Sequence, residues 1–137
     1  FRGDYHVVVC HRAHVISLGD DGLPAPYLSW RWAVRRPQVS PLVFPTGVGG
    51  VLYPPGVFHP DVLRSDIFMN LCPHADDLWL YWMVRLNKGM ARKIGWGYKG
   101  FDWPSSQDSA LFHKNVASDG NDRQIRNLIS RYGFPDA

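Results

Sequence analysis

Cysteine is scarce in this sequence: Cys10 and Cys72 are the only two among 137 residues. They lie far apart, without the short spacing of a metal-binding motif and without the pattern of a disulfide framework. Two such cysteines in a chain of this size are typical of reduced, buried thiols. We therefore expect no structural disulfide and a cytoplasmic protein.

Long hydrophobic runs and a strong net charge are also missing. No uninterrupted apolar stretch is long enough to cross a bilayer, and we find no secretory signal pattern. The formal net charge is +3, from 15 Lys and Arg against 12 Asp and Glu. This excess is too weak to indicate nucleic-acid binding, so we expect no nucleic-acid partner. An anionic ligand or a membrane surface is compatible with it.

The composition that is present is that of a folded domain. Apolar residues make up 45% and charged residues 20% of the chain, a balance typical of globular proteins. There is no internal repeat, and we expect residues 1–137 to form a single domain. Aromatic residues reach 14%. They can build a core, or they can offer flat faces to sugar and nucleotide rings.

The segment 72–80 (CPHADDLWL) places two adjacent acids before a strongly apolar run. Pro73 supplies a turn, and the pattern predicts a helix over 75–88 that Gly89 ends. The helix is apolar almost all the way round, so we expect it to be buried on most sides. Asp76 and Asp77 then fall in its first turn. They are either favourable charges at a helix N-terminus or a rigidly mounted general base.

The rest of the chain predicts a mixed α/β (α+β) fold. Short apolar segments at 5–10, 15–18, 51–53 and 91–96 are typical of strands, 38–45 reads as extended, and 27–34 is ambiguous. Residues 58–68 predict a short helix with a turn. Residues 122–132 predict an amphipathic last helix, with Asn121 as its N-cap. We expect a small mixed sheet packed against the buried central helix and this C-terminal helix.

A glycine-rich loop precedes the strand at 51–53. Gly47, Gly49 and Gly50 would let the backbone approach a ligand closely. A dinucleotide fingerprint requires a helix after the glycines, and here a strand follows, so that interpretation fails. The loop is either part of an acceptor site or a tight corner of the sheet.

Two further groups of residues have open interpretations. Trp30 and Trp32 alternate with Arg31 in a segment that also carries Arg35 and Arg36. This segment can clamp a sugar or a phosphate, or it can be an edge element whose basic side chains extend to solvent. His11 and His14 are three residues apart. In extended chain they point to opposite faces, so we do not expect them to share a metal ion.

Three stretches together resemble bacterial glycosyltransferases of the A-type fold, the group that makes capsule or lipopolysaccharide sugars. They are residues 11–14 (HRAH), 44–55 (FPTGVGGVLYPP) and 72–80 (CPHADDLWL). The start of the last helix, at Asn121 and Asp122, is similar as well. The resemblance covers nearly the whole chain. Each stretch is weak by itself, and the succession of the glycine loop and the acidic segment is what makes it specific.

The resemblance implies a transferase that moves a sugar from a nucleotide-sugar donor to a saccharide or lipid-linked saccharide acceptor. It makes Asp77 the first choice for the general base, with Asp76 beside it, and it places the glycine loop at the donor–acceptor junction. We assign Arg12, Trp30 and Trp79 to substrate binding. It also implies Mn²⁺ or Mg²⁺, with His113 as a ligand, and a cytoplasmic location, with peripheral association at the inner face of the membrane.

The chain departs from the group in one respect. Such enzymes hold the metal and the nucleotide diphosphate through an Asp-any-Asp motif at the end of an early strand, which should stand upstream of Tyr5. No such motif stands there, and Asp20-Asp21 lies in the wrong place. We therefore expect this chain, which begins abruptly at Phe1, to be the C-terminal, acceptor-side part of a longer enzyme. It would be inactive without the missing N-terminal half.

Two alternatives stay open at this point. The first is a non-catalytic carbohydrate-binding or interaction domain that uses Trp30, Trp32, Trp96 and Trp103 as stacking platforms and the arginine cluster for acidic sugars. The second is a metal hydrolase that uses His11, His14 or His74 together with Asp76. The first explains the aromatic residues but not two acids at the start of a buried helix.

Overall fold

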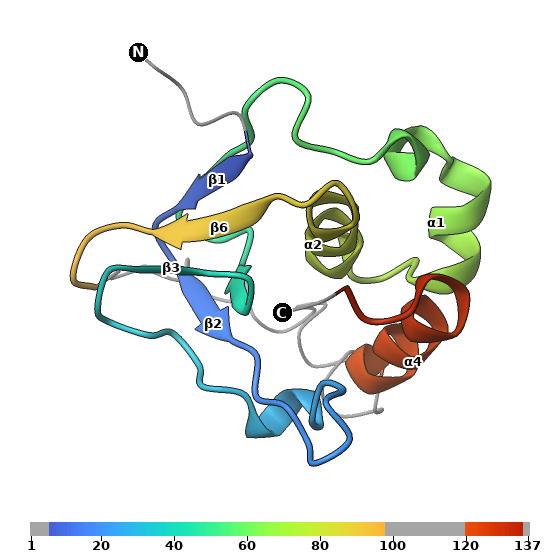
Figure 1. Cartoon of the computed structure of the whole chain (residues 1–137), viewed down its shortest axis with the longest axis horizontal. Coiled ribbons are helices and arrows are strands. Elements are labelled where there is room, and N and C mark those ends of the chain that lie inside the picture. The colour runs from blue at the N-terminus through green and yellow to red at the C-terminus, as the bar shows by residue number, and fades with distance from the viewer. Residues whose placement is uncertain (1–5, 98–119, 136–137) are drawn as a thin grey trace, which may run out of the picture.

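A computed structural model describes residues 6–97 and 120–135. Within them the fold is mixed α/β, with a four-stranded sheet in the order β3-β6-β1-β5 and a two-stranded sheet of β2 and β4 (Figure 1). The strands are β1 Val7–Cys10, β2 Ala13–Val15, β3 Gln38–Ser40, β4 Val43–Pro45, β5 Val51–Leu52 and β6 Met90–Lys93. The α-helices are α1 Ser65–Leu71, α2 Asp76–Leu86 and α4 Gly120–Tyr132, and the 3-10 helices are η1 Tyr27–Ser29 and η2 Pro60–Leu63.

Strands β1 and β6 are the parallel pair at the centre of the larger sheet, in register from Val7 opposite Met90 to Cys10 opposite Lys93. Strand β5 pairs antiparallel with β1, and β3 pairs antiparallel with β6. Parallel strands require a long crossover connection, and α1 and α2 lie in it. Because β1 and β6 run the same way, the loops that follow them emerge at the same edge of the sheet.

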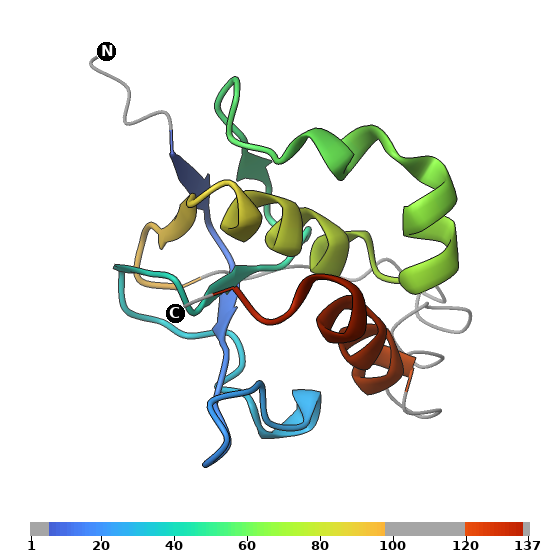
Figure 2. The same cartoon turned by 45° about the vertical axis from the view of Figure 1, so that its right-hand side comes forward.

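Helix α2 is the centre of the core, as its sequence predicts. Six of its eleven residues are buried: Leu78, Trp79, Tyr81, Trp82, Met83 and Val84. The helix lies between the strands on one side and α1 and α4 on the other (Figures 1 and 2), and it contacts η2, α4 and β4. Burial of each large apolar side chain is worth roughly 1.5–3 kcal/mol. The first turn of α2 is therefore mounted on a rigid support.

The end of α2 differs in detail from the expectation that Gly89 stops the helix. The helix ends at Leu86, and Lys88 adopts the left-handed conformation with φ of 61°. Gly89 has another reason to be small. A Cβ there would lie 2.8 Å from Val84 Cγ1 and 3.0 Å from the His6 carbonyl oxygen. The glycine thus allows the chain to pass close to α2 as it enters β6.

Other boundaries shift because tertiary contacts select among local options. The strand expected at 15–18 is found at 13–15, where Ala13 and Val15 pair with β4. The extended segment 38–45 forms two strands, β3 and β4, which belong to different sheets. The helix expected at 58–68 splits into η2 and α1, and the ambiguous segment 27–34 contains η1 and an isolated antiparallel bridge between Arg31 and Val15. The last helix starts at Gly120, so Asn121 lies inside it and is not its cap.

Both cysteines are buried and free, as expected. In the described part of the chain, no helix combines the length and the hydrophobicity that crossing a membrane requires.

Candidate functional site

A cleft of about 310 Å³ lies where the loops after β1 and β4 meet the first turns of α2 and α4. Strand β2 and the segment 27–32 complete its wall. The described residues that line it are Arg12, His14, Tyr27, Trp32, Thr46, Gly47, Val48, His74, Ala75, Asp76, Asp77 and Asn121. The two acids and part of the glycine loop, which the sequence analysis singled out separately, therefore border the same cleft.

Asp77 is the partly buried acid of the pair. Burial, followed by the negative charge of Asp76, raises the pKa of the Asp77 carboxyl to about 6. The backbone N–H of Leu78 donates to Asp77 Oδ1 at 2.9 Å and opposes part of this increase. A carboxyl with such a pKa is mostly ionised at neutral pH and is a stronger base than an ordinary aspartate.

Asp76 has a different environment, although it is the adjacent residue. Its side chain is exposed, and its Oδ1 accepts a hydrogen bond from the backbone N–H of Asp77 at 2.9 Å. This contact satisfies one of the donors that a helix N-terminus leaves without an intrahelical partner. Asp76 thus fits the structural interpretation of the pair, whereas Asp77 has the environment of a general base.

Arg12 brings a cation to the same cleft. Its Nη1 donates to Thr46 Oγ1 at 3.0 Å, while the Thr46 backbone N–H and hydroxyl both bond to the Arg12 carbonyl oxygen, at 3.2 and 3.3 Å. These contacts tie the loop after β1 to the loop after β4. A guanidinium has five N–H donors, so the contact with Thr46 leaves others for a ligand.

His14 supplies a neutral ring to the cleft wall. It is 2% exposed, and its Nδ1 accepts a hydrogen bond from the Ala33 backbone N–H at 3.0 Å. Burial and the nearby charge of Arg12 lower the pKa of His14 to about 4. The imidazole is therefore neutral at pH 7, with its proton on Nε2, and it stacks on Trp32 at 4.8 Å between ring centroids.

Helix α4 fixes both walls of the cleft. Gln124 is 2% exposed; its Oε1 accepts from the His74 backbone N–H at 3.0 Å, and its Nε2 donates to the Gly120 carbonyl at 3.0 Å. Asp122 Oδ1 accepts from the Tyr27 backbone N–H at 2.7 Å. The start of α4 therefore positions the loop before α2 on one side and η1 on the other.

The three glycines play different parts. Gly47 lines the cleft together with Val48. Gly49 and Gly50 both have φ of 89°, a conformation that side-chain-bearing residues rarely adopt, and they are not among the lining residues. Gly49 and Gly50 turn the chain into β5, while Gly47 and Val48, at the start of the loop, line the cleft.

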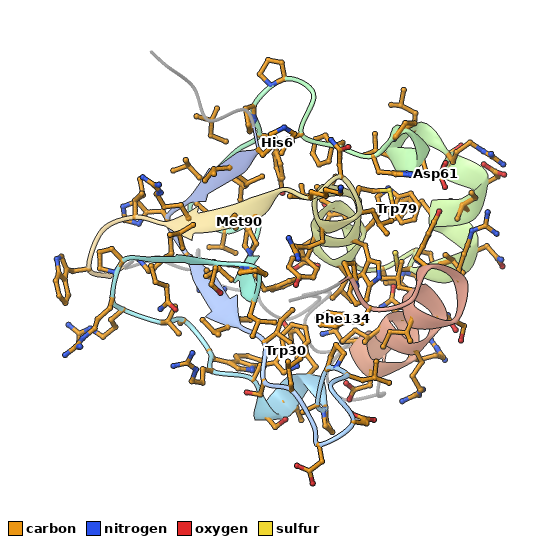
Figure 3. All side chains as sticks on the ribbon, viewed as in Figure 1. His6, Trp30, Asp61, Trp79, Met90 and Phe134 are labelled. Atoms are coloured by element: carbon orange, nitrogen blue, oxygen red, sulfur yellow. The ribbon has the colours of Figure 1, made fainter. Side chains whose placement is uncertain are left out.

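Trp30 and Trp79, which we assigned to substrate binding, lie in the core instead (Figure 3). Trp30 is 4% exposed and its Nε1 donates to the Ala25 carbonyl at 2.9 Å. Trp79 is 3% exposed and its Nε1 donates to the Val62 carbonyl at 3.3 Å. Each ring is enclosed by apolar neighbours and each indole N–H has a partner, so we remove both residues from the candidate site.

The metal ligand that the resemblance implies, His113, lies outside the described residues, as does Trp103. Within residues 6–97 and 120–135, no group of three or more His, Cys, Asp or Glu side chains is placed to hold a metal ion. His11 lines a neighbouring cavity, and His14 lines the cleft. The described residues do not by themselves fit Mn²⁺ or Mg²⁺, and we derive no step through a metal.

Sequence reasoning missed Thr46 and Gln124. Thr46 directly precedes the glycine loop, and its position next to a suspected ligand-binding turn was the available signal. Gln124 gave no local signal, because its two partners are the backbone groups of His74 and Gly120, and His74 is 50 residues away.

Comparison with family models finds none that matches this sequence, and comparisons with curated proteins and with solved structures find no match either.

Proposed function

We propose that this chain is the acceptor-side part of a nucleotide-sugar glycosyltransferase, with Asp77 as its general base. The observation that carries the proposal is the placement of Asp77. It is partly buried at the start of a rigid helix, it has a pKa raised to about 6, and it borders a cleft together with Gly47 and Arg12. The resemblance of segments 11–14, 44–55 and 72–80 to bacterial A-type glycosyltransferases supports the same function.

The proposed reaction follows from these groups. An acceptor hydroxyl in the cleft gives its proton to an Asp77 carboxylate oxygen as its own oxygen forms a bond to the anomeric carbon of the donor. The bond between that carbon and the nucleotide diphosphate breaks, and the diphosphate leaves with the bonding electron pair. In this proposal Arg12 and Asn121, which line the same cleft as Asp77, bind saccharide hydroxyls and orient the acceptor.

The finer parts of the proposal rest on the resemblance alone. They are the A-type fold, a donor-binding acidic motif upstream of Tyr5, and use of Mn²⁺ or Mg²⁺ with His113. They also include a role in capsule or lipopolysaccharide synthesis at the inner face of the membrane. The functional test therefore uses the longest gene-encoded form of the chain and a panel of UDP- and GDP-sugars with saccharide acceptors.

The test compares Asp77→Asn with Asp76→Asn, which removes the neighbouring, exposed carboxylate. We expect Asp77→Asn to lower transfer by about 10²–10⁴-fold without weakening donor binding, the range typical of a lost general base. Asp76→Asn should stay within about tenfold of wild type. In wild type, kcat/KM should rise with pH through about 6 as Asp77 loses its proton. Near-normal turnover by Asp77→Asn would rule out this assignment.

A second candidate, carbohydrate binding without catalysis, is favoured by two tryptophans that do reach cavities. Trp32 lines the cleft, and Trp96, which is 68% exposed, lines the neighbouring cavity. Saccharide titration monitored by Trp fluorescence separates the two functions. Binding without transfer in the longest form, together with equal affinities of wild type and Asp77→Asn, would favour the binding domain.

A further inference from the structure

A second, larger cavity of about 540 Å³ lies beyond Arg12, at the edge of the sheet where parallel strands β1 and β6 end. Its described lining residues are His11, Arg12, Ala33, Val34, Arg35, Lys93, Trp96 and Gly97. They come from the loop after β1, the end of β6 with the segment that follows it, and the segment before β3. The last two run side by side in Figures 1 and 2.

The charge on this cavity is of one sign. Arg12, Arg35 and Lys93 line it, and no acid is among the described lining residues. In the described part of the chain, the one ion pair joins Arg64 to Asp66, so these three cations have no carboxylate partner there. A cavity lined by cations, with no carboxylate partner for them among the described residues, attracts anions and holds them more strongly than an open surface does.

Lys93 is the most informative of the three cations because it is 1% exposed. Its Nζ donates to the Ile94 carbonyl at 2.8 Å and to the Gly95 carbonyl at 2.9 Å. An ammonium has three N–H donors, and burial of its charge is costly unless an opposite charge compensates it. Two neutral carbonyls provide hydrogen bonds but no negative charge. An anion in the cavity would provide it.

Arg12 and Trp96 add a second cation and an aromatic ring to the wall of this cavity. Arg12 is held by its bond to Thr46, and it lines both this cavity and the cleft that contains Asp77. Trp96 is 68% exposed and is among the residues that line the cavity. Aromatic faces bind the flat sides of sugar and base rings. The cavity thus joins an anion-binding wall to a platform for a ring.

We propose that this cavity binds the phosphate group of a phosphorylated, ring-bearing small molecule, with Arg12, Arg35 and Lys93 on the phosphate and Trp96 against the ring. Three cations with many N–H donors match the three terminal oxygens of a phosphate monoester, and charge-assisted hydrogen bonds of this kind are the strong ones. The inference does not rest on glycosyl transfer, because binding at this cavity requires no proton transfer by Asp77.

Isothermal titration calorimetry on the whole chain tests the proposal with three soluble probes: glucose 1-phosphate, inorganic phosphate and glucose. We expect glucose 1-phosphate to bind more tightly than inorganic phosphate, and glucose to give no heat. Arg35→Gln should weaken glucose 1-phosphate binding about tenfold, as loss of one charge-assisted hydrogen bond does. Arg36→Gln is the matched control: its side chain is exposed and does not line the cavity, so it should change affinity less than twofold.

Two further arms separate the ring and the source of the phosphate. Trp96→Ala should weaken glucose 1-phosphate but not inorganic phosphate. Vesicles that contain phosphatidic acid should bind no better than neutral vesicles. Equal losses in the two arginine variants, no binding of any phosphate probe, or Arg35-dependent binding to the vesicles alone would overturn the proposal. Asp77→Asn should bind glucose 1-phosphate like wild type, so failure of the proposed transferase activity is distinguishable from failure here.

Discussion

Asp76 and Asp77 show how far two adjacent, identical residues can differ. Both line the cleft, but Asp76 is exposed and accepts a hydrogen bond from the backbone N–H of Asp77, whereas Asp77 is partly buried. The helix dipole favours the charged form of both acids. At Asp77, burial and the neighbouring charge outweigh it and raise the pKa to about 6. Solvent exposure, which sequence spacing does not contain, decides which of the two has the properties of a base.

Asp77→Asn should therefore stabilise the protein at pH 7. The folded state keeps a partly buried charge there at a cost, and the amide removes it. We expect the free energy of unfolding to rise by about 1–2 kcal/mol, allowing for the partial exposure of the side chain. Urea denaturation at pH 7 measures this change. Asp76→Asn, at the exposed neighbour, should stay within about 0.5 kcal/mol of wild type. Equal effects in the two variants would contradict the assignment of different environments.

At the scale of elements, α2 carries Asp76 and Asp77, and the neighbouring elements position the two ends of this helix. Gln124 on α4 holds the loop that leads into α2, and Lys88 and Gly89 shape its exit toward β6. Local sequence signals place the helix, but contacts from other elements fix where it starts and how the chain leaves it.

At the end of α2, substitutions of two adjacent residues should change the free energy of unfolding in opposite directions. Lys88→Gly should raise the free energy of unfolding by about 0.5–1 kcal/mol, because φ of 61° strains a side-chain-bearing residue and not a glycine. Gly89→Ala should lower it by about 1–3 kcal/mol, because the new Cβ would meet Val84 Cγ1 and two backbone oxygens within 3.1 Å. Thermal unfolding of both variants checks this. A change of the same sign in the free energy of unfolding of both variants would contradict the backbone strain at Lys88 or the close packing at Gly89.

The support from α4 can be tested at Gln124. Gln124→Leu keeps the side-chain size but removes the acceptor of the His74 N–H and the side-chain donor to the Gly120 carbonyl. Unsatisfied buried groups cost about 1–3 kcal/mol in total here, and hydrogen exchange at the His74 amide should become faster. Arg123→Leu, one residue away and exposed, is the control and should leave that amide unchanged. A loss of stability without faster exchange at the His74 amide would contradict the claim that Gln124 positions the loop before α2.

At the scale of the whole molecule, His14 and Asp77, two titratable groups in one cleft, have opposite effects on how stability changes with pH. The pKa of His14 falls from its ordinary 6.5 to about 4, so the unfolded chain binds the extra proton between these values and stability rises with pH there. The pKa of Asp77 rises from 3.8 to about 6, so the folded chain binds the extra proton and stability falls as pH rises over nearly the same range. Each contribution is about 2–3 kcal/mol, and the two have opposite signs.

The wild-type free energy of unfolding should therefore change by less than about 1 kcal/mol between pH 4.5 and 6.5. In Asp77→Asn only the His14 contribution is left, and stability should rise by about 2 kcal/mol over that range. Denaturation at a series of pH values measures both profiles. An NMR titration of the His14 ring gives a direct check: a midpoint near 6.5 would refute the assigned environment, while one near 4 would agree with it.

The sequence by itself determined the mixed α/β class, the buried central helix and the position of two acids at its start. These features depend on the local spacing of apolar and turn-forming residues, which is written along the chain. Only the tertiary structure decided that Asp77 borders the cleft, that Trp30 and Trp79 belong to the core, and that Arg12 meets Thr46. The direction in which a side chain faces is set by elements far away in sequence, and local periodicity contains no record of them.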